Sequence, residues 1–282
     1  MLKICALYSG SSGNSIFVSS RQESSAFYNQ GTGGAFLHGT NLLVDIGVNG
    51  KEIQTAMQAI EESVTDVHGI LLTHEHADHM RGIGVVMRRY GIPLYVNPVT
   101  WKKMQQLAIG KIPEHLVHFI NSGSAFEIGD LLVQSFRTPH DAVESVGYKI
   151  SYKNSNVSVF TDIGEIRDEI LDSVSGSDAI FIESNYDYDM LWNGDYPWYL
   201  KKRIHGANGH LSNNDCAKTI GTLLERGTSR FILSHLSKEN NSPEIALETT
   251  SLFLKEKGAN IGKDVVIQVA KRSGPSTPWI LS

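Results

Sequence analysis

The sequence is poor in cysteine and in long apolar runs, and it has no excess of positive charge. Two cysteines, Cys5 and Cys216, occur in 282 residues, too few for the disulfide framework of small secreted domains. The apolar runs are strand-length, far below the roughly 18 residues of a membrane span. Met1–Ser9 lacks the basic segment and long apolar run of a signal peptide. We therefore expect a reduced, cytoplasmic protein without a membrane anchor.

The formal net charge of −5 excludes a protein that coats nucleic acid by charge alone. Any nucleic-acid contact must then be local. Short basic clusters occur at Arg88–Arg89, Lys102–Lys103 and Lys201–Arg203, although each is more commonly a solvated face. With 41% hydrophobic and 20% charged residues and no low-complexity linker, we expect one globular domain over residues 1–282.

Apolar strand patterns alternate with amphipathic helix patterns, which predicts an α/β fold. The expected helices are 51–62, 79–90, 213–225 and 243–255. The expected strands are 2–8, 15–19, 41–45, 69–73, 92–96, 131–136, 147–152, 157–161, 179–183 and 231–234. A polar segment, Arg21–Gly34, interrupts the early strands. Asn185–Gly209 is rich in aromatic residues but has no clear period; a long loop over a small satellite core is favoured there over a lid or a base-stacking surface.

The segment Thr73–His79 (THEHADH) concentrates three histidines and two carboxylates between an apolar strand and a helix. Imidazole and carboxylate are ligands that suit zinc, iron and manganese. Alternate residues His74 and His76 project to one side of an extended loop, whereas Asp78 and His79 begin the helix and turn toward a neighbouring ion. Glu75 then points away. A helix cap would need one such residue rather than five, so the pattern favours a metal site.

Three further candidates follow predicted strands. His140, Asp162 and His235 each lie just past the end of a strand, the edge at which α/β sheets place their ligands. Each residue alone would be weak evidence, but the ordered set is geometrically compatible with one cluster.

The pattern His-x-His-x-Asp-His after a strand, followed by His, Asp and His, resembles the metallo-β-lactamase-fold hydrolases. This resemblance implies an αββα four-layer sandwich with two mixed sheets flanked by helices. It also implies two divalent metal ions, zinc, manganese or iron, that activate a hydroxide for hydrolysis of phosphodiesters, thioesters or lactams. The implied ligands are His74, His76 and His140 for the first ion, Asp78, His79 and His235 for the second, and Asp162 as the bridge.

Three other segments, Ser9–Ser15 (SGSSGNS), Gly209–Asn213 (GHLSN) and His235–Asn241 (HLSKENN), are similar to the YycJ/WalJ-type family, also called VicX. The likeness covers nearly the whole chain. It implies a bacterial cytoplasmic 5′–3′ exonuclease on double-stranded DNA, with DNA favoured over RNA as the nucleic-acid partner. The glycine-rich Ser9–Asn14 loop either shapes a turn or cradles a phosphate, and we favour the turn.

His210 lies outside the implied ligand set and just before the helix predicted near Asn213. It resembles the additional histidine of related phosphodiesterases and transfer-RNA-processing nucleases, and would contact the scissile phosphate or protonate the leaving oxygen. Together with Asp78 it is our catalytic candidate. The alternative is that His210, with Ser212, caps the helix.

Two other functions stay open. A small-molecule phosphodiester or thioester hydrolase of the same fold would have a closed, narrow pocket. A non-hydrolytic iron-binding redox or sensor protein would resemble the oxygen-reducing relatives of this fold, which normally add a flavin domain for which this chain has no room. The sequence leaves open the native metal and the oligomeric state.

Overall fold

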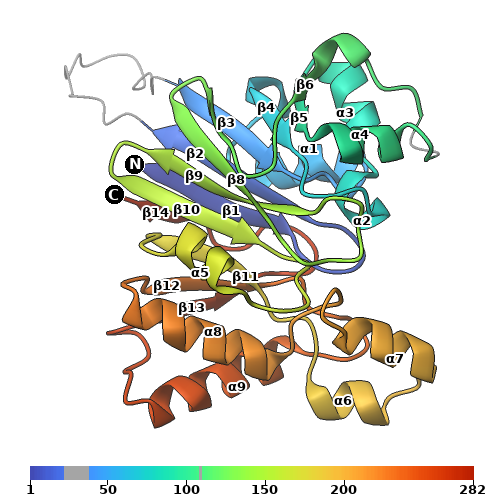
Figure 1. The fold of residues 1–282 in the computed structure, drawn as a ribbon. Coiled ribbons are helices and arrows are strands. Elements are labelled where there is room, and N and C mark those ends of the chain that lie inside the picture. Colours follow the sequence, from blue (N-terminus) through green and yellow to red (C-terminus); the bar gives the residue numbers. More distant parts are fainter. Residues whose placement is uncertain (22–37, 108–109) are drawn as a thin grey trace.

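The computed structural model describes residues 1–21, 38–107 and 110–282, so most of the polar segment predicted at Arg21–Gly34 lies outside the described residues. Two seven-stranded sheets pack face to face and helices cover their outer faces (Figure 1).

The first sheet has the strand order β14-β1-β2-β3-β4-β5-β6. The first three strands are antiparallel, β3 to β6 run parallel, and β14 pairs antiparallel with β1. The strands are β1 (Leu2–Tyr8), β2 (Ser15–Arg21), β3 (His38–Val44), β4 (Gly69–Leu71), β5 (Leu94–Val96), β6 (Val117–Phe119) and β14 (Trp279–Leu281).

The second sheet has the order β13-β12-β11-β10-β9-β8-β7 and the same change from antiparallel to parallel pairing, at β10. The strands are β7 (Ala125–Ile128), β8 (Leu131–Arg137), β9 (Val146–Tyr152), β10 (Ser155–Phe160), β11 (Ala179–Glu183), β12 (Arg230–Ser234) and β13 (Val266–Val269).

The helices fall into two sets. Over or beside the first sheet are α1 (Gly50–Ala59), α2 (Ala77–Met80), α3 (Ile83–Tyr90) and α4 (Pro98–Met104), with the 3₁₀ turns η1 (Val64–Asp66) and η2 (Glu114–Leu116). With the second sheet are α5 (Asp168–Val174), α6 (Tyr188–Asn193), α7 (Trp198–His205), α8 (Asn213–Glu225) and α9 (Pro243–Glu256). Within the described ranges, no helix combines the length and apolarity needed to cross a bilayer.

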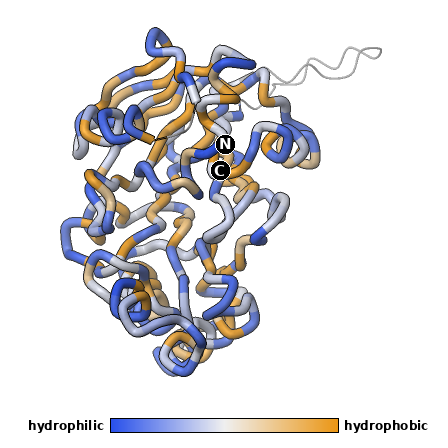
Figure 2. The backbone as a smooth tube through the Cα atoms, turned by 90° about the vertical axis from the view of Figure 1, so that its right-hand side faces the viewer, coloured by the Kyte–Doolittle hydropathy of each residue, from blue (hydrophilic) through white to orange (hydrophobic). Residues whose placement is uncertain are grey.

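Three apolar clusters hold these layers together: one between the sheets, one under α1, α3 and α4, and one under α5, α8 and α9. Figure 2 shows hydrophobic and hydrophilic stretches alternating along the chain, as amphipathic elements require. Burying each large apolar side chain contributes about 1.5–3 kcal/mol. Tyr148 is fully buried between the sheets, and its hydroxyl donates to the Leu72 carbonyl at 2.6 Å. This bond ties β9 to the segment that follows β4 and leads into the histidine motif.

The sequence did not predict strands β6, β7, β13 and β14 or helices α4 and α5. Two of the segments that were assigned from the sequence also differ in the structure. The helix expected over 79–90 is interrupted between α2 and α3, where the Gly82 amide donates to the Ile46 carbonyl at 2.8 Å. A Cβ on Gly82 would lie 2.1 Å from the Val48 carbonyl oxygen, so this close approach requires glycine. Asn185–Gly209, predicted as a loop, contains α6 and α7. Both are short, and aromatic side chains on several sides hide their periodicity.

Candidate metal centre and catalytic site

The predicted site residues follow strands of both sheets. The histidine motif follows β4, His140 follows β8, Asp162 follows β10 and His235 follows β12 directly. The parallel strands β4, β10 and β12 end at one edge of the sandwich, with α2 above it and α7 below it in Figure 1. The structure therefore gathers segments that are more than 150 residues apart in the sequence.

The seven residues predicted as metal ligands all lie in groups whose potential ligand atoms are within 4.8 Å of one another. Asp162 shares one group with a residue from each of the two implied sites. The groups are His74, His76 and His140; Asp78, His79 and His235; His74, His79 and Asp162; and Asp162, Glu183, His210 and His235.

The chain bends sharply at three of the strand ends that build the cluster. Asp45, Asp162 and His235 have φ angles of 61°, 59° and 57°, the left-handed region that non-glycine residues enter at a cost of order 1–3 kcal/mol. Each follows a strand by one or two residues. The surrounding structure holds these three residues in the strained conformation, which directs each side chain toward the cluster.

Asp45 orients His79. Its carboxylate accepts from the Thr73 amide at 2.8 Å, from the Thr73 hydroxyl at 2.8 Å and from His79 Nδ1 at 2.7 Å. The Thr73 oxygen in turn lies 3.0 Å from His74 Nδ1. Because Nδ1 of each ring is engaged, Nε2 is the nitrogen that each presents to the cluster.

Glu183, like Asp45, is a carboxylate to which sequence reasoning assigned no role. It ends β11, is fully buried, and accepts from His210 Nδ1 at 2.8 Å and from His235 Nδ1 at 2.7 Å. The amides of Ile163 and Leu211 also donate to it, at 2.9 and 3.1 Å. The available signal was a carboxylate closing an apolar strand, the pattern also shown by Asp45 after its strand.

His210 does not cap a helix. The cap of α8 is Ser212, whose hydroxyl oxygen accepts from the Asp215 amide at 3.1 Å. Burial opposes protonation of His210, but the charge and hydrogen bond of Glu183 raise the pKa of its imidazole above the usual value. Of the two residues in the capping alternative, Ser212 is confirmed as the helix cap and His210 takes no part in it.

The cluster fits bound cations. His74 Nε2 and Asp162 Oδ2 are buried, and neither has a hydrogen-bond partner among the described residues. Leaving such a group unsatisfied costs about 1–3 kcal/mol or more. Asp162 Oδ2 lies 3.1 Å from His79 Nε2, so an oxygen and a nitrogen lone pair face each other when the His79 proton is on Nδ1. A cation between Asp162 Oδ2 and His79 Nε2 would satisfy both of these atoms.

The electrostatics of the cluster also favour positive charge at its centre. Burial keeps the pKa of His74 well below its usual value, so that ring is neutral and suited to ligation. Burial also opposes protonation of His235, yet Asp162, Asp78 and Glu183 raise its pKa to about 10. Burial would raise the pKa of Asp162, but His235 and His79 hold it well below its usual range.

The cluster opens into a pocket of about 370 Å³. One side is formed by His76, Asp78, Asp162, His210 and His235, and the opposite side by Tyr196, Leu200, Arg203 and Ile204 around α7. Glu75 points away, as predicted, and accepts from the Val143 amide at 3.0 Å.

The Ser9–Asn14 loop forms the favoured turn, in which the Gly13 amide donates to the Gly10 carbonyl at 2.9 Å. The side-chain nitrogen Nδ2 of Asn14 lies 3.4 Å from Asp78 Oδ2 and 3.0 Å from His79 Nε2. The loop thus supports the cluster from beneath α2.

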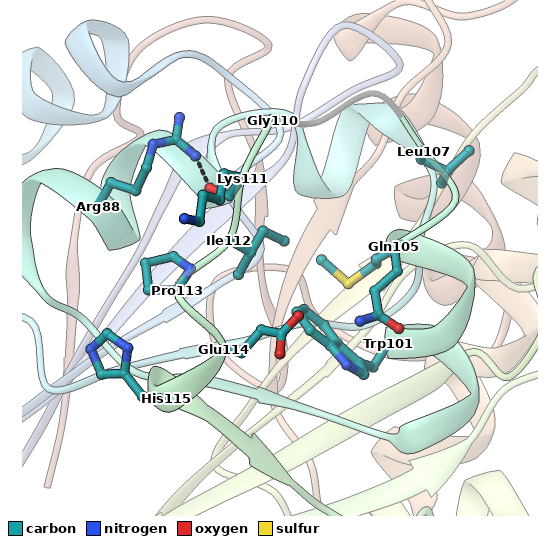
Figure 3. A pocket seen from close by; sticks show the side chains of 11 residues that line it. Arg88, Trp101, Gln105, Leu107, Gly110, Lys111, Ile112, Pro113, Glu114 and His115 are labelled. Carbon is teal, nitrogen blue, oxygen red and sulfur yellow. Dashed lines mark hydrogen bonds between the residues drawn. The ribbon is translucent and has the colours of Figure 1, made fainter.

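A larger cavity, of about 740 Å³, lies between α3, α4 and Gly110–His115 (Figure 3). Trp101, Met104 and Ile112 contribute apolar surface, and Arg88 bonds the Lys111 carbonyl at its rim. It shares no described lining residue with the pocket at the cluster. Size alone therefore does not identify the chemical site.

Comparison with known proteins agrees with this geometry. A family model described as "Beta-lactamase superfamily domain" matches residues 40–236. Exodeoxyribonuclease YycJ of Bacillus anthracis is 36% identical over 262 residues, covering 93% of this chain and 92% of the relative. Exodeoxyribonuclease WalJ of Streptococcus pneumoniae is 35% identical over 263 residues, covering 93% of this chain and 91% of the relative. The chain belongs to the YycJ/WalJ family of the β-lactamase superfamily.

The fold of this YycJ/WalJ-family protein is also found in a solved structure with little sequence identity. The metallo-β-lactamase fold protein YhfI of Bacillus subtilis superposes with a TM-score of 0.68 and 15% identity, with 98% of each chain covered. The predicted αββα sandwich with two mixed sheets is confirmed. Together the family, the fold and the histidine–aspartate groups confirm the predicted class, a metal-dependent hydrolase of the nuclease type.

Proposed function

We propose that this YycJ/WalJ-family protein is a cytoplasmic exodeoxyribonuclease that degrades duplex DNA from the 5′ end with two divalent metal ions. The observation that carries the proposal is that Asp162 lies in one group of potential ligands with His74 and His79, one residue from each implied site. The relatives named exodeoxyribonuclease support DNA as the substrate, and the family resemblance implies the 5′ polarity. Cys5 and Cys216 are buried and unpaired, which supports a reducing compartment.

In this proposal, three residues of each group would hold one ion, and Asp162 would be shared between the two groups. The first group is His74, His76 and His140, and the second is Asp78, His79 and His235. The unpartnered atoms His74 Nε2 and Asp162 Oδ2 support the assignment. Zinc, manganese and iron all accept these donors, so supply and geometry decide the native metal.

Two divalent cations held there would supply a nucleophile at neutral pH and stabilise the negative charge that develops on a phosphodiester. The residues of the chain position the substrate between them and α7. His210 Nδ1 donates to Glu183, which leaves Nε2 to donate a proton to the leaving oxygen or a hydrogen bond to the phosphate. Glu183 orients this ring and also holds His235.

The substrate assignment is tested by supplying the chelator-treated protein with zinc, manganese or iron and measuring turnover. The substrates are duplex DNA labelled at the 5′ or the 3′ end, RNA duplexes of the same sequence, and bis(p-nitrophenyl) phosphate. We expect metal-dependent release of labelled nucleotide from the 5′-labelled duplex at early times, while the 3′-labelled strand shortens progressively.

Cleavage of the small ester but of neither polymer would support a small-molecule phosphodiesterase instead. Faster cleavage of RNA than of DNA would overturn the choice of polymer. No hydrolysis with any of the metals would contradict the enzyme itself.

A further inference from the structure

Helix α7 forms the wall of the metal-site pocket that faces the histidine motif. Tyr196, Leu200, Arg203 and Ile204 line the pocket. Figure 1 shows α6 and α7 as a pair below the edge at which the strands end. A molecule bound in the pocket therefore lies against this helix.

The outer edge of α7 next to the pocket carries Tyr199, Lys202 and Arg203, which we call the α7 edge. Helical spacing of three and four residues places the Tyr199 side chain beside those of Lys202 and Arg203. Tyr199 is 74% exposed, and in the described part of the chain its ring makes no aromatic pair, whereas Trp198 packs against Trp192 with ring centroids 5.0 Å apart. The Tyr199 ring is therefore accessible for stacking by a planar group.

The α7 edge carries two cationic side chains, Lys202 and Arg203. Lys201, the third basic residue of α7, is buried and donates to the Trp192 and Gly194 carbonyls, so it adds no charge at this edge. Arg203 Nε donates to Asp141 Oδ2 at 2.5 Å, and the other Asp141 oxygen lies 3.4 Å from His140 Nε2. Among the described residues, no hydrogen bond reaches the two Nη groups of Arg203. Asp141 thus anchors a guanidinium beside the cluster with most of its donors free for an anion.

We propose that the α7 edge binds an unpaired stretch of the substrate strand, with Arg203 on a phosphate next to the scissile one and Tyr199 stacked on a base. This inference rests on the nucleic-acid substrate proposed above and adds the form that the bound strand takes. A base can stack on a side chain only when it has left the stack of its duplex. The positive charge of Lys202 and Arg203 complements the phosphate backbone. Because Arg203 also lines the metal-site pocket, a strand bound at the α7 edge leads into that pocket.

Binding can be measured separately from cleavage in the full-length Asp78→Ala variant. The probes are a fluorescent blunt duplex and the same duplex with an unpaired 5′ tail, followed by anisotropy. We expect Tyr199→Ala to weaken binding of the tailed duplex by about 5- to 150-fold, with little effect on the blunt duplex. Tyr199→Phe, which keeps the ring, is expected to bind as its parent does.

Arg203→Gln is expected to weaken binding of the tailed duplex and to reduce the slope of log affinity against log salt by about 0.7. Phe119→Ala and Arg226→Gln are matched controls. Phe119 is 59% exposed on β6, and Arg226 forms a 2.7 Å ion pair with Asp172. Urea unfolding of each variant separates lost binding from lost folding.

If Tyr199→Ala and Arg203→Gln bind the tailed duplex as their controls do, while the wild-type protein degrades DNA, the inference is overturned and the proposed function stands. Equal weakening with blunt and tailed duplexes would contradict the unpaired strand. If the parent binds neither probe and the wild-type protein cleaves no DNA, the proposed function fails and this inference with it.

Discussion

Asp78→Ala is expected to lower the turnover of duplex DNA by about 10³-fold or more, because it removes a ligand from the second metal group and with it several kcal/mol of transition-state stabilisation. Asp78 Oδ2 lies 3.4 Å from His235 Nε2 and 3.7 Å from His79 Nε2. Its side chain is 22% exposed and lies at the pocket, so the substitution should leave the apolar core intact. Turnover and bound metal are measured on the same preparation.

Glu75→Gln is the matched control for this prediction. Glu75 belongs to the same motif, but its carboxylate accepts from the Val143 amide outside the cluster, and glutamine retains that acceptor. We expect this variant to keep wild-type turnover and metal content. Full activity in Asp78→Ala, or equal losses in both variants, would contradict the assignment of Asp78.

His210→Ala is expected to lower turnover by about 10²- to 10⁴-fold, the usual contribution of a positioned acid–base group, with metal content unchanged. The reason is that His210 lines the pocket and its Nδ1 bonds Glu183, which is not one of the seven assigned metal ligands. His115→Ala, at an exposed histidine of η2, is the control. Wild-type turnover in His210→Ala would remove this residue from the catalytic group.

Glu183→Gln separates orientation from proton transfer. Glutamine keeps the size of the side chain but has a single acceptor oxygen. Its NH2 group must therefore face either the two imidazoles that bond Oε1 or the Ile163 and Leu211 amides that donate to Oε2. We expect a loss of about 10- to 100-fold in metal affinity, in addition to lower turnover. A drop in turnover without a change in metal affinity would mean that Glu183 acts through His210 alone.

The alternation of strands and helices could be predicted from the sequence because apolar periodicity reports local burial. The ends of β10 and β12 could also be placed well enough to expect Asp162 and His235 at one edge. The break between α2 and α3 could not, since it depends on the approach of Gly82 to Val48, which lies on a different segment. Close contacts between distant segments leave no periodic signal.

The metal ligands could be identified because their chemistry is concentrated in a short motif and their order matches a known family. Glu183 and Asp45 were not assigned roles because a carboxylate after a strand is common, and only the structure brings each one to an imidazole. The Arg203–Asp141 pair joins residues 62 positions apart, and it depends on the placement of α7, which was predicted as loop. Long-range pairing of this kind has to be read from the structure.

Titration of the chelator-treated protein with metal, followed by turnover of 5′-labelled duplex DNA, tests the two-metal hydrolase most directly. The account predicts no turnover without metal and a rate that rises until two ions are bound per chain, with Asp162→Ala unable to reach that rate at any metal concentration. Full turnover with one bound ion, or with none, would contradict it.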